Sequence, residues 1–237
     1  MTTLDQHSER PTLLLIGASR GLGHAMAACF VEAGWRVVGT VRGTARTPLH
    51  ELAETSPLVE IETLDINEPE QIQSLRQRLS ARRFDMLFVN AGTTNEHPNQ
   101  TTGEVSTEEF IRVMVTNALS PIRAIETLQD LVSPDGLIGI MSSGQGSIAN
   151  NENGGREVYR GSKAALNQYM RCYAARQTGG RRALVLMAPG WIRTALGGPE
   201  APYSIEDAVP QIVNVLLAQQ GKPGLRYLDR FGNTVPW

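Results

Sequence analysis

The residues best suited to chemistry in this sequence are a tyrosine and a lysine four positions apart, Tyr159 and Lys163. On a helix this spacing places both side chains on one face, one turn apart. A neighbouring ammonium group stabilises a phenolate, so we expect the pKa of Tyr159 to lie below the usual value of about 10. Such a tyrosine can give a proton to a reacting oxygen or accept one from it. Because the same spacing also arises by chance on surface helices, the pair needs support from the rest of the chain.

A glycine-rich turn near the N-terminus is typical of a dinucleotide site. An apolar run at 12–16 predicts a buried strand, Gly17, Gly21 and Gly23 follow it, and a helical pattern extends from 25 to 33. Glycines let the backbone approach a pyrophosphate, and the helix N-terminus supplies free N–H groups. The spacing is GxxxGxG rather than GxGxxG, and a plain tight turn is the alternative interpretation.

The residues after the second predicted strand indicate which nicotinamide cofactor the site prefers. An NAD site usually has an acidic residue there, which binds the ribose 2′-hydroxyl. Here the strand at 36–41 is followed by Arg42, and Arg20 lies in the glycine turn. Two guanidinium groups suit a 2′-phosphate. We therefore expect NADP(H), with two ordinary surface arginines as the alternative.

Strand and helix patterns alternate along the rest of the chain. Further strands are predicted at 59–64, 86–89, 136–141, 183–187 and 225–228, and helices at 68–80, at 107–132, from Tyr159 to 177 and at 204–219. This alternation predicts an α/β protein with a single-domain Rossmann fold, a doubly wound and mostly parallel seven-stranded sheet with helices on both faces. The domain spans 1–237, with 1–10 expected to form a loose polar tail.

A proline interrupts the long helical pattern at 107–132. Pro121 has no N–H donor, and its ring clashes with the carbonyl four residues earlier, which belongs to Asn117. A free carbonyl beside an amide side chain suits an ordered water. A simple kink is the alternative.

Composition excludes several other classes of protein. The net charge of −2 over 237 residues gives no indication of a nucleic-acid or membrane-surface partner. No apolar run approaches the ~20 residues of a membrane span, and the N-terminus has no signal-peptide core. Cys29 and Cys172 are expected to be reduced thiols that are buried or half-buried, with no metal site. The cytoplasm is the expected compartment.

Six motifs in this order resemble the short-chain dehydrogenase/reductase family, and the resemblance covers nearly the whole chain. They are Gly17-x-x-x-Gly21-x-Gly23, Asn90-Ala91-Gly92, Asn117, Ser143, Tyr159-x-x-x-Lys163 and Pro189-Gly190. The Gly-Ser-Ile after the serine strand, the Asn-rich loop, the sequence around Tyr159 and the closing Gly-Asn-Thr-Val-Pro-Trp are similar to the subgroup of carbonyl reductases of the sniffer and C-factor type.

The resemblance implies a catalytic role for four residues. Tyr159 would exchange a proton with the carbonyl or alcohol oxygen, and Ser143 would orient that oxygen. Lys163 would lower the pKa of the tyrosine and bind the nicotinamide ribose. Asn117 would hold a water that links Lys163 to a proton relay.

The resemblance also implies a set of cofactor contacts. Besides Tyr159 and Lys163, these would come from the glycine turn, the ends of the second, third and fourth strands and the loop after the sixth: Gly17, Ser19, Arg20, Gly21, Leu22, Gly23, Arg42, Asp65, Ile66, Asn90, Ala91, Gly92, Pro189, Gly190, Ile192 and Thr194.

Three departures from the family pattern affect these expectations. Ile16 and Val89 stand where the family usually has Thr and Asn, and the interval from Ser143 to Tyr159 is longer than usual, so that its loop must bulge. Ser142 is the alternative to Ser143. The substrate is not identified, although Gln145, Asn151, Trp191 and the loop at 93–98 are expected to line the pocket.

The family pattern predicts an NADP-dependent oxidoreductase that reduces an aldehyde or ketone to an alcohol. The same residues serve the oxidation of an alcohol equally well. A cofactor-binding signalling or regulatory protein with little turnover is the rival, although a pure binder has no need for all four catalytic residues. The family commonly pairs through the helices of Asn117 and Tyr159, so we expect a homodimer or homotetramer.

Overall fold

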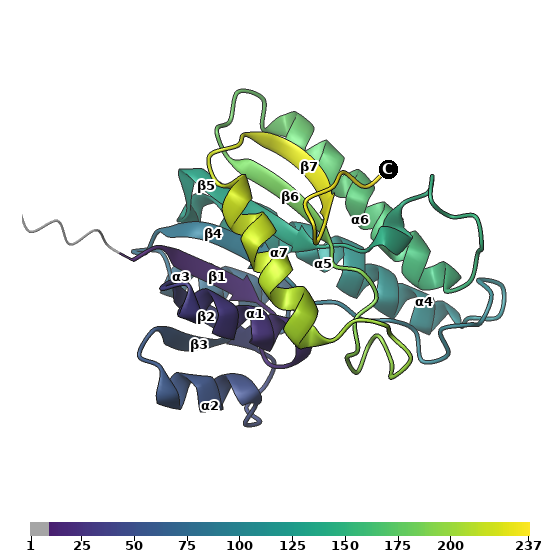
Figure 1. Ribbon diagram of the computed structural model, residues 1–237, viewed down its shortest axis with the longest axis horizontal. Helices are drawn as coiled ribbons and strands as arrows, with labels where there is room; N and C mark the ends of the chain where they lie inside the picture. The colour runs from purple at the N-terminus through teal and green to yellow at the C-terminus, as the bar shows by residue number, and fades with distance from the viewer. Residues whose placement is uncertain (1–9) are drawn as a thin grey trace, which may run out of the picture.

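A seven-stranded parallel sheet forms the centre of the molecule within residues 10–237, the part of the chain that the computed structural model describes (Figure 1). Its strands are β1 Thr12–Ile16, β2 Arg36–Val41, β3 Val59–Thr63, β4 Phe84–Val89, β5 Val132–Met141, β6 Ala183–Ala188 and β7 Gly224–Asp229. They lie in the order β3-β2-β1-β4-β5-β6-β7, and all neighbouring pairs are parallel. The predicted doubly wound sheet is confirmed. The tail predicted at 1–10 falls, apart from residue 10, outside the described residues.

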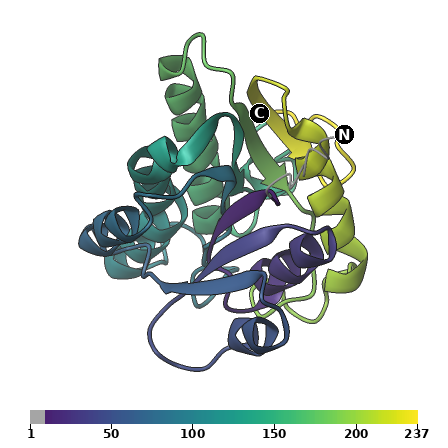
Figure 2. The same cartoon turned by 90° about the vertical axis from the view of Figure 1, so that its left-hand side faces the viewer.

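Helices cover both faces of the sheet, as predicted (Figure 2). One face packs against α1 Gly21–Glu32, α2 Pro48–Thr55 and α7 Ile205–Gln219, through a cluster that includes Phe30 and Leu216. The other packs against α3 Pro69–Arg78, α5 Ser120–Leu128 and α6 Glu157–Arg176, through a cluster that includes Leu128 and Tyr173. Because both faces are buried, the central strands β1, β4 and β6 are apolar along nearly their whole length, whereas the edge strand β3 carries two glutamates.

The helix predicted at 107–132 is divided into several elements. α4 Thr107–Met114 is followed by a π-helical turn, Val115–Leu119, in which the N–H of Ser120 bonds the carbonyl of Val115. Pro121 lies in the first turn of α5, where a missing N–H costs nothing. The predicted interruption is therefore a wide turn, after which α5 continues the chain.

β5 begins four residues earlier than predicted. A short 3-10 turn, Gln129–Leu131, ends the helical segment, and β5 starts at Val132. Its register with β4 shifts between Phe84 and Met86, because Val132 pairs with Phe84 but Leu137 pairs with Met86. The intervening segment contains Pro134, which has no N–H for the sheet. This bulge hid the first part of the strand from a pattern-based prediction.

The sequence did not predict α2, whose start is set by a capping box. Thr47 is its N-cap, and the Thr47 N–H donates to Nδ1 of His50 at 3.1 Å. Pro48 occupies the first turn, where its fixed φ suits a helix. A side-chain cap also begins α7, where the N–H of Asp207 donates to Oγ of its N-cap Ser204 at 3.0 Å.

Among the described residues, no helix has the length and apolar character needed to cross a membrane. Cys29 and Cys172 are free thiols; Cys29 is half-buried, whereas Cys172 is exposed. Within residues 10–237, no group of three or more His, Cys, Asp or Glu side chains is placed to hold a metal ion.

The topology determines where a ligand can bind. The strand order reverses between β1 and β4, and in open α/β sheets ligands bind outside the carboxyl ends of the strands at such a point. These ends lie on the right of Figure 1, where the longer loops gather.

Candidate active site

The glycine turn after β1 is fixed between β2 and β4. The N–H of Gly17 donates to Oγ1 of Thr40 at 2.9 Å, and Nδ2 of Asn90 donates to the carbonyl of Gly17 at 2.9 Å. Gly17 has φ +88, and a Cβ there would lie 2.8 Å from the backbone nitrogen of Ala91. A Cβ on Gly23 would lie 2.0 Å from the carbonyl oxygen of Gly17. The turn therefore excludes side chains at both positions.

The start of α1 has the properties of an anion site. Its N-cap, Arg20, makes no side-chain capping bond, and the first turn has no acidic residue. Gly21 has φ +56, and a Cβ there would meet only Cγ2 of Thr194, at 3.9 Å. The first N–H groups of this twelve-residue helix have no partner within the helix, and the positive end of the helix dipole lies behind them. These residues fit the pyrophosphate of a dinucleotide.

The other predicted cofactor residues gather along the same edge of the sheet. Ser19 and Leu22 lie in the turn, and the remainder follow β2, β3, β4 and β6: Arg42, Asp65, Ile66, Ala91, Gly92, Pro189, Gly190, Ile192 and Thr194. Arg20 and Arg42 are both exposed. Gly92 connects this edge to the catalytic residues, because a Cβ there would lie 3.4 Å from Oδ1 of Asn117 and 3.5 Å from Nζ of Lys163.

Tyr159 and Lys163 lie one turn apart on α6, and both are buried. Nζ of Lys163 donates to the carbonyl of Met141 at the end of β5, at 2.9 Å, and lies 5.8 Å from the centroid of the Tyr159 ring. Burial lowers the pKa of Lys163 to about 8. The lysine therefore links α6 to β5 and titrates closer to neutrality than a surface lysine.

The pKa of Tyr159 is raised, whereas the sequence predicted that it would be lowered. Desolvation by burial raises it, and this effect outweighs a hydrogen bond to Ser143 and the charge of Arg156, which both lower it. The neutral phenol is thus the stable form in this structure. A neutral phenol is the form that can donate a proton.

The two neighbouring serines have different surroundings. Oγ of Ser142 is buried and donates to Oδ1 of Asn167 at 2.6 Å, so it is occupied within the core. Ser143 is half-buried; its Oγ accepts from the N–H of Gln145 at 3.2 Å and lies near enough to the phenol of Tyr159 to lower its pKa. The geometry therefore favours Ser143 over Ser142 as the hydroxyl that faces a substrate.

Asn117, in the π-helical turn, is fully buried and has several hydrogen-bond partners. Its Oδ1 accepts from the N–H of Thr93 at 2.8 Å, and its Nδ2 donates to the carbonyl of Thr93 at 2.8 Å and to Oγ of Ser162 at 2.9 Å. Ser162 in turn donates to the carbonyl of Tyr159 at 2.7 Å. Asn117 therefore joins the loop after β4 to α6, while the water expected beside it stays a prediction.

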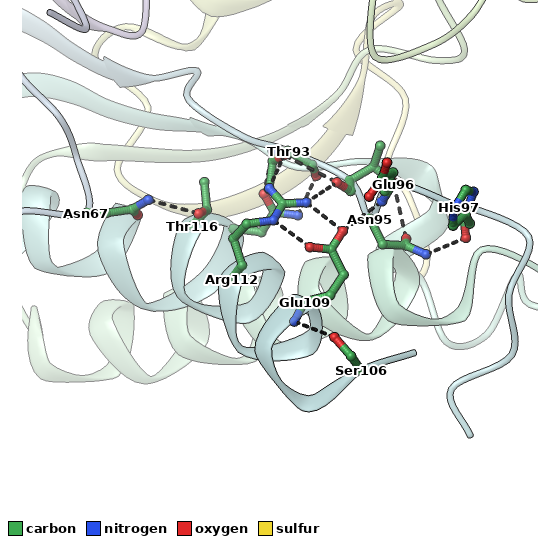
Figure 3. Close-up of polar contacts among 11 residues, drawn as sticks. Asn67, Thr93, Asn95, Glu96, His97, Ser106, Glu109, Arg112 and Thr116 are labelled. Atoms are coloured by element: carbon green, nitrogen blue, oxygen red, sulfur yellow. Dashed lines mark hydrogen bonds and ion pairs between the residues drawn. The ribbon is translucent and has the colours of Figure 1, made fainter. Parts of the chain in front are cut away.

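An ion pair on α4 fixes the loop after β4 (Figure 3). Nε of Arg112 donates to Glu109 at 2.7 Å, and its terminal nitrogens reach Oγ1 of Thr93 at 3.0 Å and the carbonyl of Thr94. The hydrogen bond from Arg112 lowers the pKa of Glu109 to about 2. This network holds the backbone that Asn117 contacts. His97 is exposed in the same loop.

A buried arginine near the C-terminus shapes the loop after β6. The guanidinium of Arg230 lies 3.8 Å from the ring centroid of Tyr203 and donates to the carbonyl of Pro189 at 3.3 Å. Gly190 has φ +92, and a Cβ there would lie 2.4 Å from Arg230. The glycine of the Pro-Gly motif is therefore required by the close approach of this arginine.

Sequence reasoning did not identify several of these supporting residues. Ser162 could have been identified from the sequence, because it lies on α6 between Tyr159 and Lys163. Thr40, Thr93 and Arg230 had none, because their roles depend on which segments the fold brings together.

The fold and the site together define a nucleotide-binding α/β protein with a Ser–Tyr–Lys cluster at the carboxyl edge of its sheet. The family described as Enoyl-(Acyl carrier protein) reductase matches residues 17–212. The chain belongs to the short-chain dehydrogenase/reductase family, and it is an oxidoreductase of that family.

Solved structures support the same assignment. A protein of Burkholderia multivorans, described as a short-chain dehydrogenase/reductase and crystallised with bound NADP, is 66% identical, with 96% of this chain and all of that chain covered and a TM-score of 0.95. A carbonyl reductase from Pseudomonas aeruginosa PAO1, in complex with NADP, is 31% identical over 96% of this chain and 100% of that one, with a TM-score of 0.88. The C-signal protein of Myxococcus xanthus is 32% identical over 65% of this chain and 92% of its own.

Proposed function

We propose that this protein is an NADPH-dependent reductase of aldehydes or ketones. The observation that carries the proposal is the buried, neutral phenol of Tyr159, which has the Ser143 hydroxyl near it and the Lys163 ammonium one helical turn away. A proton donor and a second hydroxyl directed at one point suit an oxygen that gains negative charge during reduction.

Each residue of the cluster has a distinct task in this reaction. NADPH, when bound, supplies the hydride for the carbonyl carbon. Tyr159 donates its proton to the carbonyl oxygen, and the hydroxyl of Ser143 donates a hydrogen bond to the same oxygen. Lys163 places a positive charge near the phenol, which stabilises the phenolate as the proton leaves. Asn117 holds the backbone on which these groups depend.

The preference for the phosphorylated cofactor rests on two exposed arginines and two relatives. Arg20 lies in the loop after β1, and Arg42 directly follows β2, where a 2′-phosphate is expected. The residues from 42 to 47 contain no acidic side chain. The Burkholderia and Pseudomonas proteins were both crystallised with NADP. We expect NADPH to bind at least about tenfold more tightly than NADH.

Two alternatives stay open. The same four residues serve alcohol oxidation with NADP⁺, because a proton donor for one direction is the proton acceptor for the other. The likeness to the C-signal protein keeps open a signalling role with little turnover. Against a pure binder, the Tyr159 phenol and the Ser143 hydroxyl have no part in binding the cofactor phosphates.

We further propose a homodimer or homotetramer in the cytoplasm. Apolar side chains on the segment from α4 to α5 support self-association: Phe110 is 39% exposed, Ile111 53% and Leu119 40%. Exposed apolar groups on adjoining helices are typical of an interface between subunits.

The experiment that tests this function is NADPH oxidation by the purified protein against a broad panel of aldehydes and ketones, in parallel with titrations of NADPH and NADH. Turnover of at least one class of carbonyl is expected. Tight NADPH binding without turnover of any carbonyl or alcohol would favour the signalling role, and equal affinity for NADH would contradict the cofactor preference.

A further inference from the structure

Arg156, immediately before α6, has an unusual backbone conformation. Its φ is 52° and its ψ is 40°, and it is the sole non-glycine residue with a positive φ among residues 10–237. A long side chain in this left-handed region is disfavoured and persists where surrounding structure demands it. Gly154 and Gly155 precede it with positive φ values as well, yet this third position carries an arginine. The arginine at this position therefore needs a reason, which its guanidinium group must supply.

That guanidinium lies beside the catalytic tyrosine. Its Cζ is 5.3 Å from the centroid of the Tyr159 ring. Its Nε is buried without a hydrogen-bond partner, although the residue as a whole is half-buried. Among the described residues, no carboxylate forms an ion pair with Arg156, and the neighbouring Glu157 is occupied by Thr102, whose N–H donates to it at 2.7 Å. A buried donor without a partner needs an explanation.

Arg156 occupies the outer side of Tyr159, toward the start of α6. It precedes the tyrosine by three residues as the N-cap of α6, whereas Lys163 follows by four; Cζ of Arg156 and Nζ of Lys163 lie 5.3 Å and 5.8 Å from the centroid of the Tyr159 ring. Lys163 is buried against β5, but Arg156 is partly open to solvent. The outer side of the catalytic pair therefore carries unused hydrogen-bonding capacity.

We propose that Arg156 binds a carboxylate of the substrate, so that the preferred substrates are oxo acids, which are aldehydes or ketones with a carboxylate a few bonds from the carbonyl group. The inference rests on the proposed reductase function and specifies its substrate class. A guanidinium is always charged and binds a carboxylate through two parallel hydrogen bonds. Since the guanidinium lies 5.3 Å from the centroid of the Tyr159 ring, the carboxylate and the carbonyl of the substrate must be close together.

A purely structural role explains fewer of the observations. Stacking on the Tyr159 ring would account for the position of the guanidinium but leaves its Nε without a partner. It would also be served by a residue in an ordinary backbone conformation. A bound carboxylate accounts for an arginine at a position where glycine would cost less.

The test compares matched pairs of substrates that differ in one charge: succinic semialdehyde with its methyl ester, and phenylglyoxylic acid with its methyl ester. The variant is Arg156→Gly, because glycine adopts the left-handed conformation without strain and so preserves the start of α6. We expect the acid-to-ester ratio of kcat/KM to fall about tenfold to a hundredfold in this variant. Arg156→Lys should retain part of the ratio, because it keeps the charge but loses the paired donors.

Arg36→Gln is the control for net charge, because Arg36 is exposed at the amino end of β2, the opposite edge of the sheet. It should leave the ratio unchanged. Benzoate, which cannot react, should inhibit the unaltered protein in competition with the acid substrate and lose at least about tenfold in affinity in Arg156→Gly.

An unchanged acid-to-ester ratio in Arg156→Gly would overturn the inference while leaving the reductase function intact. Equal losses for acid and ester would do the same and assign Arg156 a structural role. Failure of the unaltered protein to reduce either member of any pair or of the wider panel would contradict the proposed function itself.

Discussion

The inner side of Tyr159, toward Lys163 and Asn117, and its outer side, toward Arg156, differ in how completely the hydrogen-bonding groups are satisfied. On the inner side, Lys163 bonds the carbonyl of Met141, and Asn117 bonds both Thr93 and Ser162. On the outer side, the buried Nε of Arg156 has no partner. Under our proposal, the protein itself satisfies the polar groups on the inner side, and a bound ligand completes the outer side.

The choice of cation differs between the two sides in the same sense. Burial brings the pKa of Lys163 to about 8, so this lysine can release a proton near neutral pH. An arginine stays charged at any physiological pH. The inner cation is thus suited to proton movement, and the outer cation to holding a fixed negative charge.

The largest expected effect is that of Tyr159→Phe, which removes the group between the two sides. Turnover should fall about a hundredfold to ten-thousandfold, because the carbonyl oxygen loses its proton donor. The affinity for NADPH, measured by fluorescence titration, should change little. Full reductase activity in this variant would show that Tyr159 is not the proton donor.

Lys163→Met breaks the inner side alone. Turnover should fall about a hundredfold for acid and ester alike, which distinguishes it from Arg156→Gly. The ratio of the two rates should stay close to that of the unaltered protein. A selective loss of the acid would mean that Lys163, and not Arg156, holds the carboxylate.

The stability of the protein should report on Lys163 as well. Because burial lowers its pKa from 10.5 to about 8, the unfolded chain binds a proton between these values that the folded chain has released. The free energy of unfolding should therefore rise with pH from about 8 to about 10.5, by roughly 1–3 kcal/mol relative to Lys163→Met. Below pH 8 both states are protonated and the difference is constant. Parallel urea denaturation of the two proteins across this range measures it.

Two serine variants should distinguish the hydroxyl that contacts the substrate, expected at Ser143, from the hydroxyl that stabilises the core, at Ser142. Ser143→Ala should lower turnover about a hundredfold with little change in stability, because it removes the donor to the carbonyl oxygen. Ser142→Ala should leave turnover nearly unchanged but cost about 1–3 kcal/mol, because it leaves Oδ1 of Asn167 unsatisfied in the core. Thermal denaturation and kinetics on the two proteins provide the comparison, and an exchange of these effects would assign the reaction to Ser142.

The smallest expected effect is at the edge of the inner network. Glu109, whose pKa Arg112 lowers to about 2, stabilises the folded state above its unfolded pKa of about 4.5, and this contribution is lost as the pH falls toward 2. In Glu109→Gln this acid dependence should weaken by less than about 1 kcal/mol, because solvent reaches both partly exposed side chains and screens the pair. Acid denaturation of the two proteins measures the change, and a large loss of turnover would show that the loop at Thr93 depends on this one pair.

The sequence allowed the fold to be predicted, and candidate site residues to be chosen, because both depend on local patterns. The glycine turn at Gly17, the strand patterns and the spacing of Tyr159 and Lys163 each lie within a short segment. The direction of the pKa shift at Tyr159 was predicted wrongly, because spacing reveals a neighbouring charge but not the extent of burial. The partnership of Thr40 with Gly17, and the left-handed conformation of Arg156, depend on contacts or backbone angles that no short pattern encodes.

The π-helical turn at Val115–Leu119 makes the site sensitive to the length of the chain rather than to its composition. The hydrogen bond that closes a π-helical turn joins residues five apart, whereas that of an α-helical turn joins residues four apart, so a π turn contains one extra residue. Deleting Ala118 would restore regular α-helical bonding, yet it would rotate the helix before the deletion by about 100° relative to the helix after it. Asn117 would then leave Thr93 or Ser162, even though its own identity had not changed. Insertions and deletions that surface loops accept are therefore excluded from this one segment.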